Sequence, residues 1–386
     1  MLKKVIGLFL CIMMVLTLVA CGKTQESNST KEDSNTQESS NILDSDNKQK
    51  SENDADAVDR GPEEIKVEPT ITPIPTITPK QEATSPAQKE TKSEVKAEIP
   101  KVYITTDIST ESLMAAYNAL GWTPEGKVGV KLSTGEPPAS NYLKPELVKD
   151  LVQSVEGTIV ECNTAYGGSR SGTAMHLQVA EDHGFTAIAE VDIQDTDGSM
   201  SLVVEGGTHL KENLVGSHFA DYDSYLVLSH FKGHEMAGFG GAIKNISIGF
   251  GSKEGKCLIH TAGRSKTSMW GGNQDHFLES MAEAGKAVSD SMNNGKNIVY
   301  INVMNRLSID CDCNGHPAEP DIHDIGILAS TDPVALDQAC IDLVYAADNN
   351  ESLVQRIEFK NGLHTLEQAE VIGLGSREYE LVNIDD

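Results

Sequence analysis

Residues 225–252 read YLVLSHFKGHEMAGFGGAIKNISIGFGS, an apolar run that leads through a glycine-rich turn into residues of helical pattern. The run at 225–228 has the length and composition of a buried strand. Three glycines, Gly238, Gly240 and Gly241, fall among four residues and allow backbone amides to approach a ligand where the next helix begins. The stretch therefore predicts a strand, a ligand-binding turn and a helix in succession.

The same alternation of strand and helix continues on both sides of this stretch. Short β-branched or apolar runs predict strands at residues 102–105, 127–132, 157–161, 187–193, 202–205, 298–302 and 325–329. Apolar residues at helical spacing, with capping residues or proline in the first turn, predict helices at residues 110–120, 145–155, 173–183, 275–292 and 333–345.

This order of elements is typical of an α/β fold, in which a mostly parallel sheet is flanked by helices. Ligands of such folds bind at the carboxyl ends of the strands. The loops that follow Leu132, Glu161, Leu228 and Asn302 are therefore the places where we expect a site. The region is long enough for one domain or for two lobes, with a break near residues 264–273.

The first 21 residues have the pattern of an export signal. Lys3 and Lys4 precede an apolar stretch at residues 5–19, which is shorter than a membrane-spanning helix needs to be. The small residue Ala20 before Cys21 resembles a bacterial lipobox, in which the cysteine is lipidated and becomes the first mature residue. The alternatives are a plain signal peptide or a membrane helix. We expect Cys21 to hold the protein by membrane lipid at the extracytoplasmic face.

Residues 22–98 predict a disordered linker. No Phe, Tyr or Trp occurs between Gly22 and Pro100, so this part of the chain cannot build a core. Its run at residues 69–79 carries a proline every few positions, which favours extended polyproline II backbone. The folded region is therefore expected at residues 99–386.

The chain has a formal charge of -27, and -22 of it falls on residues 99–386. No run of five basic residues occurs, which argues against nucleic acid as a partner because phosphate binding needs a local surplus of Lys and Arg. A small anionic ligand would need the few cations near the glycine-rich loops, which are Lys131, Arg170, Lys232, Lys244 and Lys253.

Cys311 and Cys313 alternate with two aspartates and are separated by a single residue. This spacing lets two thiolates reach one ion, so the pair is a candidate metal or redox site. The alternatives are thiols with a packing role or a local disulfide, because the Cys-x-x-Cys spacing usual for zinc is absent.

His234, Lys244 and His260 bring two imidazoles and one amine to the glycine-rich region. Imidazoles transfer protons near neutral pH and ligate metals, so the set predicts a small-molecule or metal site. His234 would act as the acid/base group and Lys244 as an electrostatic or covalent anchor. The alternative is a pair of structural histidines with a solvated lysine.

Four separated motifs resemble the family called domain of unknown function 362, over residues 102–383. They occur in the same order, at residues 234–245, 310–313, 324–337 and 373–379. Many members carry a ferredoxin-like pair of Cys-rich clusters after the position of Lys256. Here Cys257 is followed by no cysteine through Gly272, so ferredoxin-type iron-sulfur clusters are not expected.

The spacing of His234, Lys244 and His260 is also similar to the nickel-pincer nucleotide site of lactate racemase and its homologues. The resemblance implies that Lys244 is bonded to the cofactor, that His260 ligates nickel and that His234 acts as general base on a 2-hydroxy acid. The racemase has a second catalytic histidine in an upstream loop, and the matching residues 165–170 contain none. Two-base racemisation is therefore not implied, and an export signal argues against a cofactor made in the cytosol.

These patterns predict a cleft between the glycine-rich segment and the loop around Cys311, for a small anion or for a transition metal such as nickel, zinc or iron. The expected metal ligands are His260, Cys311 and Cys313. The expected ligand contacts are Gly238, Gly240, Gly241, Asn245, Lys131 and Arg170. The protein is expected to be either an enzyme that uses His234 and Lys244, or a non-catalytic lipoprotein that binds the same ligand or metal.

Overall fold

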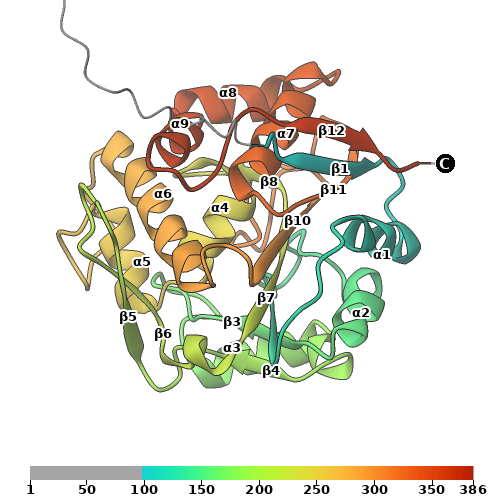
Figure 1. Cartoon of the computed structure of the whole chain (residues 1–386). Coiled ribbons are helices and arrows are strands. Elements are labelled where there is room, and N and C mark those ends of the chain that lie inside the picture. Colours follow the sequence, from blue (N-terminus) through green and yellow to red (C-terminus); the bar gives the residue numbers. More distant parts are fainter. Residues whose placement is uncertain (1–97, 386) are drawn as a thin grey trace, which may run out of the picture. The chain divides into compact units, whose positions relative to one another are not determined.

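An eight-stranded sheet organises the part of the chain that the computed structural model describes, residues 98–385 (Figure 1). Its strands follow the order β12-β1-β11-β10-β7-β2-β3-β4. Five of the seven neighbouring pairs are parallel, and the two pairs that β11 makes with β1 and β10 are antiparallel. The predicted α/β class with a mostly parallel sheet is therefore confirmed.

The strands of the sheet are β1 (Lys101–Thr105), β2 (Val128–Lys131), β3 (Thr158–Glu161), β4 (Val191–Ile193), β7 (Ser224–His230), β10 (Ile298–Met304), β11 (Gly326–Ser330) and β12 (Glu380–Asn383). Two antiparallel ribbons lie outside it, β5 (Ser199–Val203) with β6 (Glu212–Gly216) and β8 (Lys232–His234) with β9 (Gly238–Gly240).

The described residues also form nine α-helices and three short turns of other helical type. The α-helices are α1 (Thr110–Ala119), α2 (Pro145–Ser154), α3 (Thr173–Asp182), α4 (Ala242–Lys244), α5 (Lys253–His260), α6 (Gln274–Ser291), α7 (Pro333–Ala346), α8 (Glu351–Phe359) and α9 (His364–Val371). The short turns are the 3-10 helices η1 (Phe185–Ala187) and η2 (Ser217–Asp221) and the π-helical turn η3 (Asn245–Gly249).

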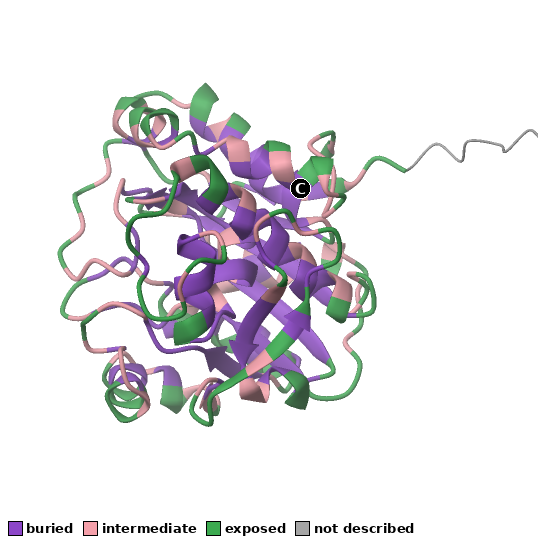
Figure 2. Ribbon diagram, turned by 90° about the vertical axis from the view of Figure 1, so that its left-hand side faces the viewer, coloured by how far each residue is buried: buried purple, intermediate pink, exposed green. Residues whose placement is uncertain are grey.

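Helices cover both faces of the sheet, as strand β7 illustrates. Tyr225 and Val227 belong to one apolar core and Leu226 and Leu228 to the other, since successive side chains of a strand point to opposite faces. The first core includes residues of α6, α7, α8 and α9, and the second includes residues of α1, α2 and α3. Figure 2 shows the strands as a buried centre beneath partly exposed helices. A sheet buried on both faces explains why its strands read as continuous apolar runs.

Most predicted elements lie close to their expected positions, because their terminal signals act locally. Ser109 precedes α1 and its Oγ accepts a hydrogen bond from the Ser112 amide at 3.2 Å. Pro145 and Pro333 begin α2 and α7. The predicted strand at 187–193 was partly wrong, because Gly184 takes a left-handed φ of 87° and the chain turns through η1 before β4 begins.

The parallel strands bring separated parts of the chain to one edge. The carboxyl ends of β2, β3 and β7 carry Lys131, Glu161 and His230, and the loop after the parallel strand β10 carries Cys311 and Cys313. The residues after β7 continue directly into the glycine-rich segment. This edge is the one at which the sequence pattern placed a site.

Several predictions concern residues 1–97, including the export signal, the lipid on Cys21 and all but the last residue of the linker. They lie outside the described residues. Residues 264–273, the expected position of a break between lobes, form the connection between α5 and α6. Within residues 98–385, no helix is both long and apolar enough to cross a membrane.

Candidate functional site

A cavity of about 290 Å³ opens at the carboxyl edge of the sheet. Ten of the eleven predicted site residues in the folded region line it, namely His234, Lys244, His260, Cys311, Cys313, Gly240, Gly241, Asn245, Lys131 and Arg170. Gly238 does not line it. Gly238 has a φ of 82°, and an added Cβ would lie 3.2 Å from the Ile357 backbone on α8, so this glycine permits a turn and a close approach of two segments.

His234 faces the cavity as a hydrogen-bond donor. Its Nδ1 accepts hydrogen bonds from the backbone amides of Met236 at 3.2 Å and Ala237 at 2.9 Å. The proton of the neutral ring must then reside on Nε2. Burial, together with the nearby charge of Lys244 and the ring of His260, holds the pKa of His234 well below its ordinary value. The ring is therefore neutral.

His260 has the opposite arrangement of its ring nitrogens. Its Nδ1 donates to the backbone carbonyl of Lys256 at 2.7 Å, which leaves an unprotonated Nε2. The ring stacks on Phe277 with 4.7 Å between centroids, so its orientation is fixed. Burial, with a smaller contribution from the charge of Lys244, lowers the pKa of His260 to about 4. A neutral imidazole held this way can accept a proton or ligate a metal.

Lys244 lies on α4 and its amine is held without a partner. Among residues 98–385 its Nζ makes no hydrogen bond and no ion pair, although the neighbouring basic side chains do. Burial and the nearby charge of Lys232 lower the pKa of Lys244 to about 7. The side chain therefore exists as both amine and ammonium near neutral pH.

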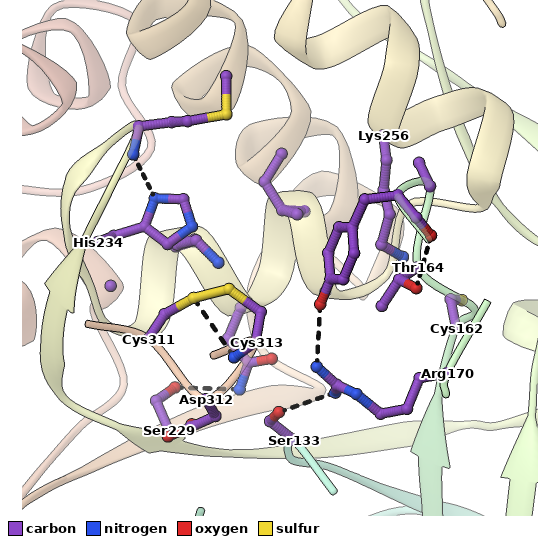
Figure 3. Close-up of a pocket in the computed structure, with 18 of the residues that line it drawn as sticks. Ser133, Cys162, Thr164, Arg170, Ser229, His234, Lys256, Cys311, Asp312 and Cys313 are labelled. Atoms are coloured by element: carbon purple, nitrogen blue, oxygen red, sulfur yellow. Dashed lines mark hydrogen bonds between the residues drawn. A yellow bond between two sulfur atoms is a disulfide. The ribbon is translucent and has the colours of Figure 1, made fainter. Parts of the chain in front are cut away.

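Lys131 and Arg170 are engaged by buried carboxylates. Lys131 Nζ lies 3.2 Å from Glu161 Oε2, and Arg170 Nη1 lies 3.3 Å from Glu161 Oε1. Arg170 Nε also contacts Glu136 at 3.2 Å, and its Nη1 and Nη2 bond to Ser133 and Tyr166 (Figure 3). Burial would raise the pKa of Glu161, but Lys131 and its other partners hold it well below its ordinary value.

The cavity is positively charged although the chain is strongly acidic. Five basic side chains line it (Lys131, Arg170, Lys232, Lys244 and Lys256) against three acidic ones (Glu161, Glu235 and Asp312). Lys232 Nζ pairs with Asp312 at 2.8 Å, and Lys256 Nζ donates to the Gly251 carbonyl at 2.5 Å. The predicted cation Lys253 is exposed and bonds to the Ser171 carbonyl at 2.9 Å, away from the cavity.

The helix that follows the glycines is already capped from within the protein. The amides of Ala242 and Ile243 donate to the two carboxylate oxygens of Asp337, at 2.8 and 2.9 Å. An added Cβ on Gly241 would lie 2.3 Å from that carboxylate, so the glycine makes room for Asp337. Asp337 of the motif at 324–337 therefore occupies the amides at the start of this helix, while Gly240 and Gly241 themselves line the cavity.

Asn245 begins the π-helical turn η3 and links it to the sheet. Its Nδ2 donates to the Leu228 carbonyl and to Ser229 Oγ, both at 3.1 Å. A π-turn widens the helix locally and is frequent at functional sites. Here it lets Asn245 reach back to the end of β7 while Lys244 stays at the cavity.

Cys311 and Cys313 form a disulfide at the wall of the cavity, next to the ring of His234 (Figure 3). His234, Cys311 and Cys313 offer ligand atoms within 4.8 Å of one another, a group that could hold a metal ion. His260 does not belong to this group. The disulfide leaves no thiolate for a metal, and His234 Nε2 carries a proton, so metal binding requires reduction and a change at His234.

Asp312 anchors the loop between the two cysteines. Its carboxylate accepts from Lys232 at 2.8 Å, and His230 Nδ1 lies 2.8 Å from the other oxygen while His230 Nε2 faces the Asn305 carbonyl at 2.6 Å. Burial opposes ionisation of Asp312, but Lys232 and His230 outweigh it and hold its pKa far below the ordinary value. The loop is thus tied to β7 and β8.

Sequence reasoning did not single out Glu161, Lys256 and Trp270 as part of the site. Glu161 ends a predicted strand, and its position at a strand end is the sequence feature that could have assigned it to the site. Lys256 lies four residues before His260, which is one helical turn. Trp270 lies at the cavity and is 69% exposed. No sequence pattern around it indicated that it belongs to the site.

Fold and cavity together define an α/β protein with a cationic cavity at the carboxyl edge of its sheet. Residues 128–342 match the domain of unknown function DUF362, and the chain belongs to this family. No protein of curated function matches the chain.

Among solved structures, the chain is similar to the lactate racemase apoprotein from Thermoanaerobacterium thermosaccharolyticum, with 12% identity, a TM-score of 0.39, and coverage of 63% of this chain and 56% of that one. A protein from Thermotoga maritima has 13% identity, a TM-score of 0.37, and coverage of 60% and 57%. The chain thus spans little more than half the length of either structure. Both likenesses are distant.

Proposed function

We propose that this protein is a lipid-anchored extracytoplasmic protein whose cavity binds a small organic anion next to Lys244. The observation that carries the proposal is the unpartnered amine of Lys244 inside a cavity whose other lysines have acceptors. The side chain of Lys244 is partly buried at the cavity, and a bound carboxylate would supply the acceptor that its amine lacks among the described residues. The anchor rests on the lipobox-like residues that end at Cys21.

The donors of the cavity fit a carboxylate. A protonated Lys244 offers a charged donor, and His234 Nε2–H offers a neutral one. Trp270 and the neighbouring Met236 and Met269 add apolar surface at the same cavity, as expected for a ligand with a short organic part. Lys131 and Arg170 would hold the frame of the cavity, because their charges are already neutralised by Glu136 and Glu161.

The same cavity has the groups for proton transfer. His260 presents an unprotonated nitrogen, and the pKa of Lys244 is lowered by burial to about 7, near the value that suits an acid/base group. A carboxylate held by Lys244 and His234 would place its neighbouring carbon among these groups. This supports acid/base chemistry at His260 and Lys244, whereas a non-catalytic binding protein would use the same donors without turnover.

Binding is tested with lactate as the probe, since the resemblance to the racemase site points to a 2-hydroxy acid. The chain has two tryptophans, Trp122 and Trp270, so a Trp122→Phe background leaves Trp270 as a reporter at the cavity. Lactate should change the fluorescence of Trp270. Lys244→Met should weaken binding about 10- to 100-fold, the loss typical of a charged hydrogen bond. The exposed Lys253→Met is the matched control and should bind as before.

An unchanged lactate affinity in Lys244→Met would contradict the proposal. Exchange of the C2 proton of lactate with deuterated water, followed by NMR, separates the two versions of the function. Exchange that His260→Gln abolishes favours an enzyme. Binding without exchange favours the non-catalytic lipoprotein.

A metal is the second candidate, because His234, Cys311 and Cys313 lie within 4.8 Å of one another. The nickel-pincer resemblance points instead to Lys244 as the attachment point and His260 as the ligand, and the free amine and unprotonated Nε2 fit those positions. When bound, such a group would supply the nickel centre at which a 2-hydroxy acid reacts. The proton on His234 Nε2 favours a role for this residue in orienting a substrate oxygen.

Elemental analysis of the purified protein tests this second candidate. Nickel near one equivalent that is lost in His260→Ala supports the pincer assignment, and zinc or iron lost in Cys311→Ser supports the cysteine group. The anchor is tested separately by growing cells with a fatty-acid probe. The protein should take up the label, and label retained in Cys21→Ala would contradict lipidation at this residue.

A further inference from the structure

We infer that the Cys311–Cys313 disulfide is a redox-active bond that exchanges with small thiols entering the cavity, with Cys313 as the attacked sulfur and Cys311 as the leaving group. This is a second activity of the same cavity and does not depend on the binding of an organic anion. It rests on four features of the described residues. They are the access of a thiol to the disulfide, the difference between the surroundings of the two sulfurs, the compensated charge of Asp312, and the burial of the other cysteines.

Both sulfurs belong to residues that line the cavity of about 290 Å³, which is large enough for a small thiol. Structural disulfides are usually packed in the interior, whereas this one faces a space open to solvent. Cys311 is 7% exposed and Cys313 is half-buried. Cys313 is therefore the more accessible residue of the pair, and nucleophilic attack on a disulfide depends on such access.

The surroundings of Cys311 stabilise a thiolate at its sulfur. The backbone amide of Cys313 donates to Cys311 Sγ at 3.4 Å. The ring of His234 offers a nitrogen within 4.8 Å of both sulfurs, and because Nδ1 accepts two backbone amides, the ring nitrogen with a proton to donate is Nε2. Donors that stabilise the departing thiolate speed the exchange.

The charge on the residue between the cysteines is neutralised. A free carboxylate at Asp312 would oppose a thiolate on either side of it. Lys232 Nζ and His230 Nδ1 each lie 2.8 Å from an oxygen of Asp312, so this repulsion is compensated within the loop itself.

The remaining cysteines of the described residues are unsuited to compete. Cys162, Cys257 and Cys340 are free but buried, and Cys162, which lines the same cavity, donates its thiol to the Phe250 carbonyl at 3.3 Å. Burial raises the pKa of Cys162 to about 12 and raises the pKa of Cys340 well above its ordinary value. The exchange is therefore confined to the pair.

The exchange balances with a thiol as the reductant. A thiolate RS⁻ attacks Cys313 Sγ, the S–S bond breaks, and its electron pair passes to Cys311 Sγ, which takes up the proton released from RSH. A second thiol then attacks the R sulfur of the mixed disulfide, releases RSSR and returns a protonated Cys313. Two thiols are oxidised by two electrons and the protein disulfide is reduced by the same two.

The experiment uses the whole protein in its native state, with glutathione as the thiol. Aerobically purified protein is incubated with glutathione, quenched with a maleimide, and mapped by mass spectrometry for label at Cys311 and Cys313. Both sites should gain label without denaturant. His234→Phe should slow the reduction at least tenfold, whereas Cys340→Ala should leave the rate unchanged.

Trapping distinguishes the two sulfurs. When the reaction of the unchanged protein with glutathione is quenched in acid at early times, mass spectrometry should find glutathione on Cys313 and not on Cys311. The inference is overturned if the pair is reduced only after unfolding, if glutathione is found first on Cys311, or if the aerobic protein carries zinc on two free thiols. Each of these outcomes leaves the lactate experiment free to succeed or fail separately.

Discussion

The two walls of the cavity hold charged side chains in opposite ways. On the paired wall, Lys131 and Arg170 are neutralised by Glu136 and Glu161 through ion pairs of 3.2 to 3.3 Å. On the open wall, formed by His234, Lys244 and His260, the amine has no acceptor among the described residues and the two rings are held in opposite tautomers. The ion-paired side chains hold one wall of the cavity in place, while the unpaired amine and the two imidazole rings are available to a ligand.

This difference explains how an acidic chain can hold a basic cavity. Lys131 and Arg170 on the paired wall add little to the positive field, because each has a carboxylate at contact distance. Lys244, on the open wall, has like-charged neighbours, and burial together with the charge of Lys232 lowers its pKa to about 7. The paired wall is expected to stabilise the fold and the open wall to weaken it.

The largest expected effect comes from breaking the paired wall. Glu161→Gln keeps the shape of the side chain but leaves Lys131 and Arg170 buried with too little negative charge. Removal of one partner from a buried ion pair costs about 3–5 kcal/mol of unfolding free energy. Urea denaturation followed by circular dichroism measures this loss. A loss below about 1 kcal/mol would show that the wall does not support the fold.

Acid dependence provides an independent readout for the same residue. Because the folded pKa of Glu161 is held below its ordinary value by Lys131 and its other partners, its stabilisation is present at neutral pH. That stabilisation is lost as the pH falls from the unfolded pKa through the folded one. The acid-induced loss of stability should therefore be smaller in Glu161→Gln than in the unchanged protein.

A substitution on the open wall should raise the unfolding free energy, whereas one on the paired wall should lower it. Lys244→Met removes a partly buried amine whose pKa is lowered to about 7, so it should raise the unfolding free energy at pH 7 by about 1–3 kcal/mol. The unfolded lysine, with a pKa near 10.5, binds more protons than the folded one, with a pKa of about 7. Stability should therefore rise between these two pH values in the unchanged protein, and this rise should be absent in Lys244→Met. A destabilised variant would show that Lys244 supports the fold.

Much of the fold was predictable because its signals are local. Capping at Ser109, proline at the starts of α2 and α7, and apolar runs in the strands each lie within a few residues of the element they define. The ribbon strands β6, β8 and β9, the edge strand β12 and the helices α5, α8 and α9 were not predicted. The residues of β12 are largely exposed, so no apolar run marks it.

The sequence predicted which residues belong to the site, but it did not predict which of them contact one another. His234, Lys244 and His260 lie within 27 residues of one another in a glycine-rich stretch, and a parallel sheet brings this stretch to the strand ends. Asp337 caps α4 from 95 residues away in the chain. This contact depends on how α7 packs against the sheet, and no local sequence pattern predicts that packing.

A smaller effect is expected from pH on ligand binding at the open wall. Only the protonated Lys244 attracts a carboxylate, and burial lowers its pKa to about 7 in the free cavity. The affinity for lactate should therefore fall about tenfold for each pH unit above that value. Titrations of Trp270 fluorescence at several pH values measure the slope. Lys244→Met should bind weakly with no such slope, and a slope that persists would assign the titration to another group.

The smallest effect is expected where an ion pair lies outside either wall. Lys266 Nζ contacts Glu212 Oε1 at 2.9 Å, a distance shorter than those on the paired wall, but the two side chains are 49% and 40% exposed. Water screens such a pair, so Glu212→Gln should change the unfolding free energy by less than about 1 kcal/mol. Comparison of Glu212→Gln with Glu161→Gln separates the effect of ion-pair contact from the effect of burial. Equal losses in the two variants would mean that contact distance, and not exclusion of water, gives the paired wall its strength.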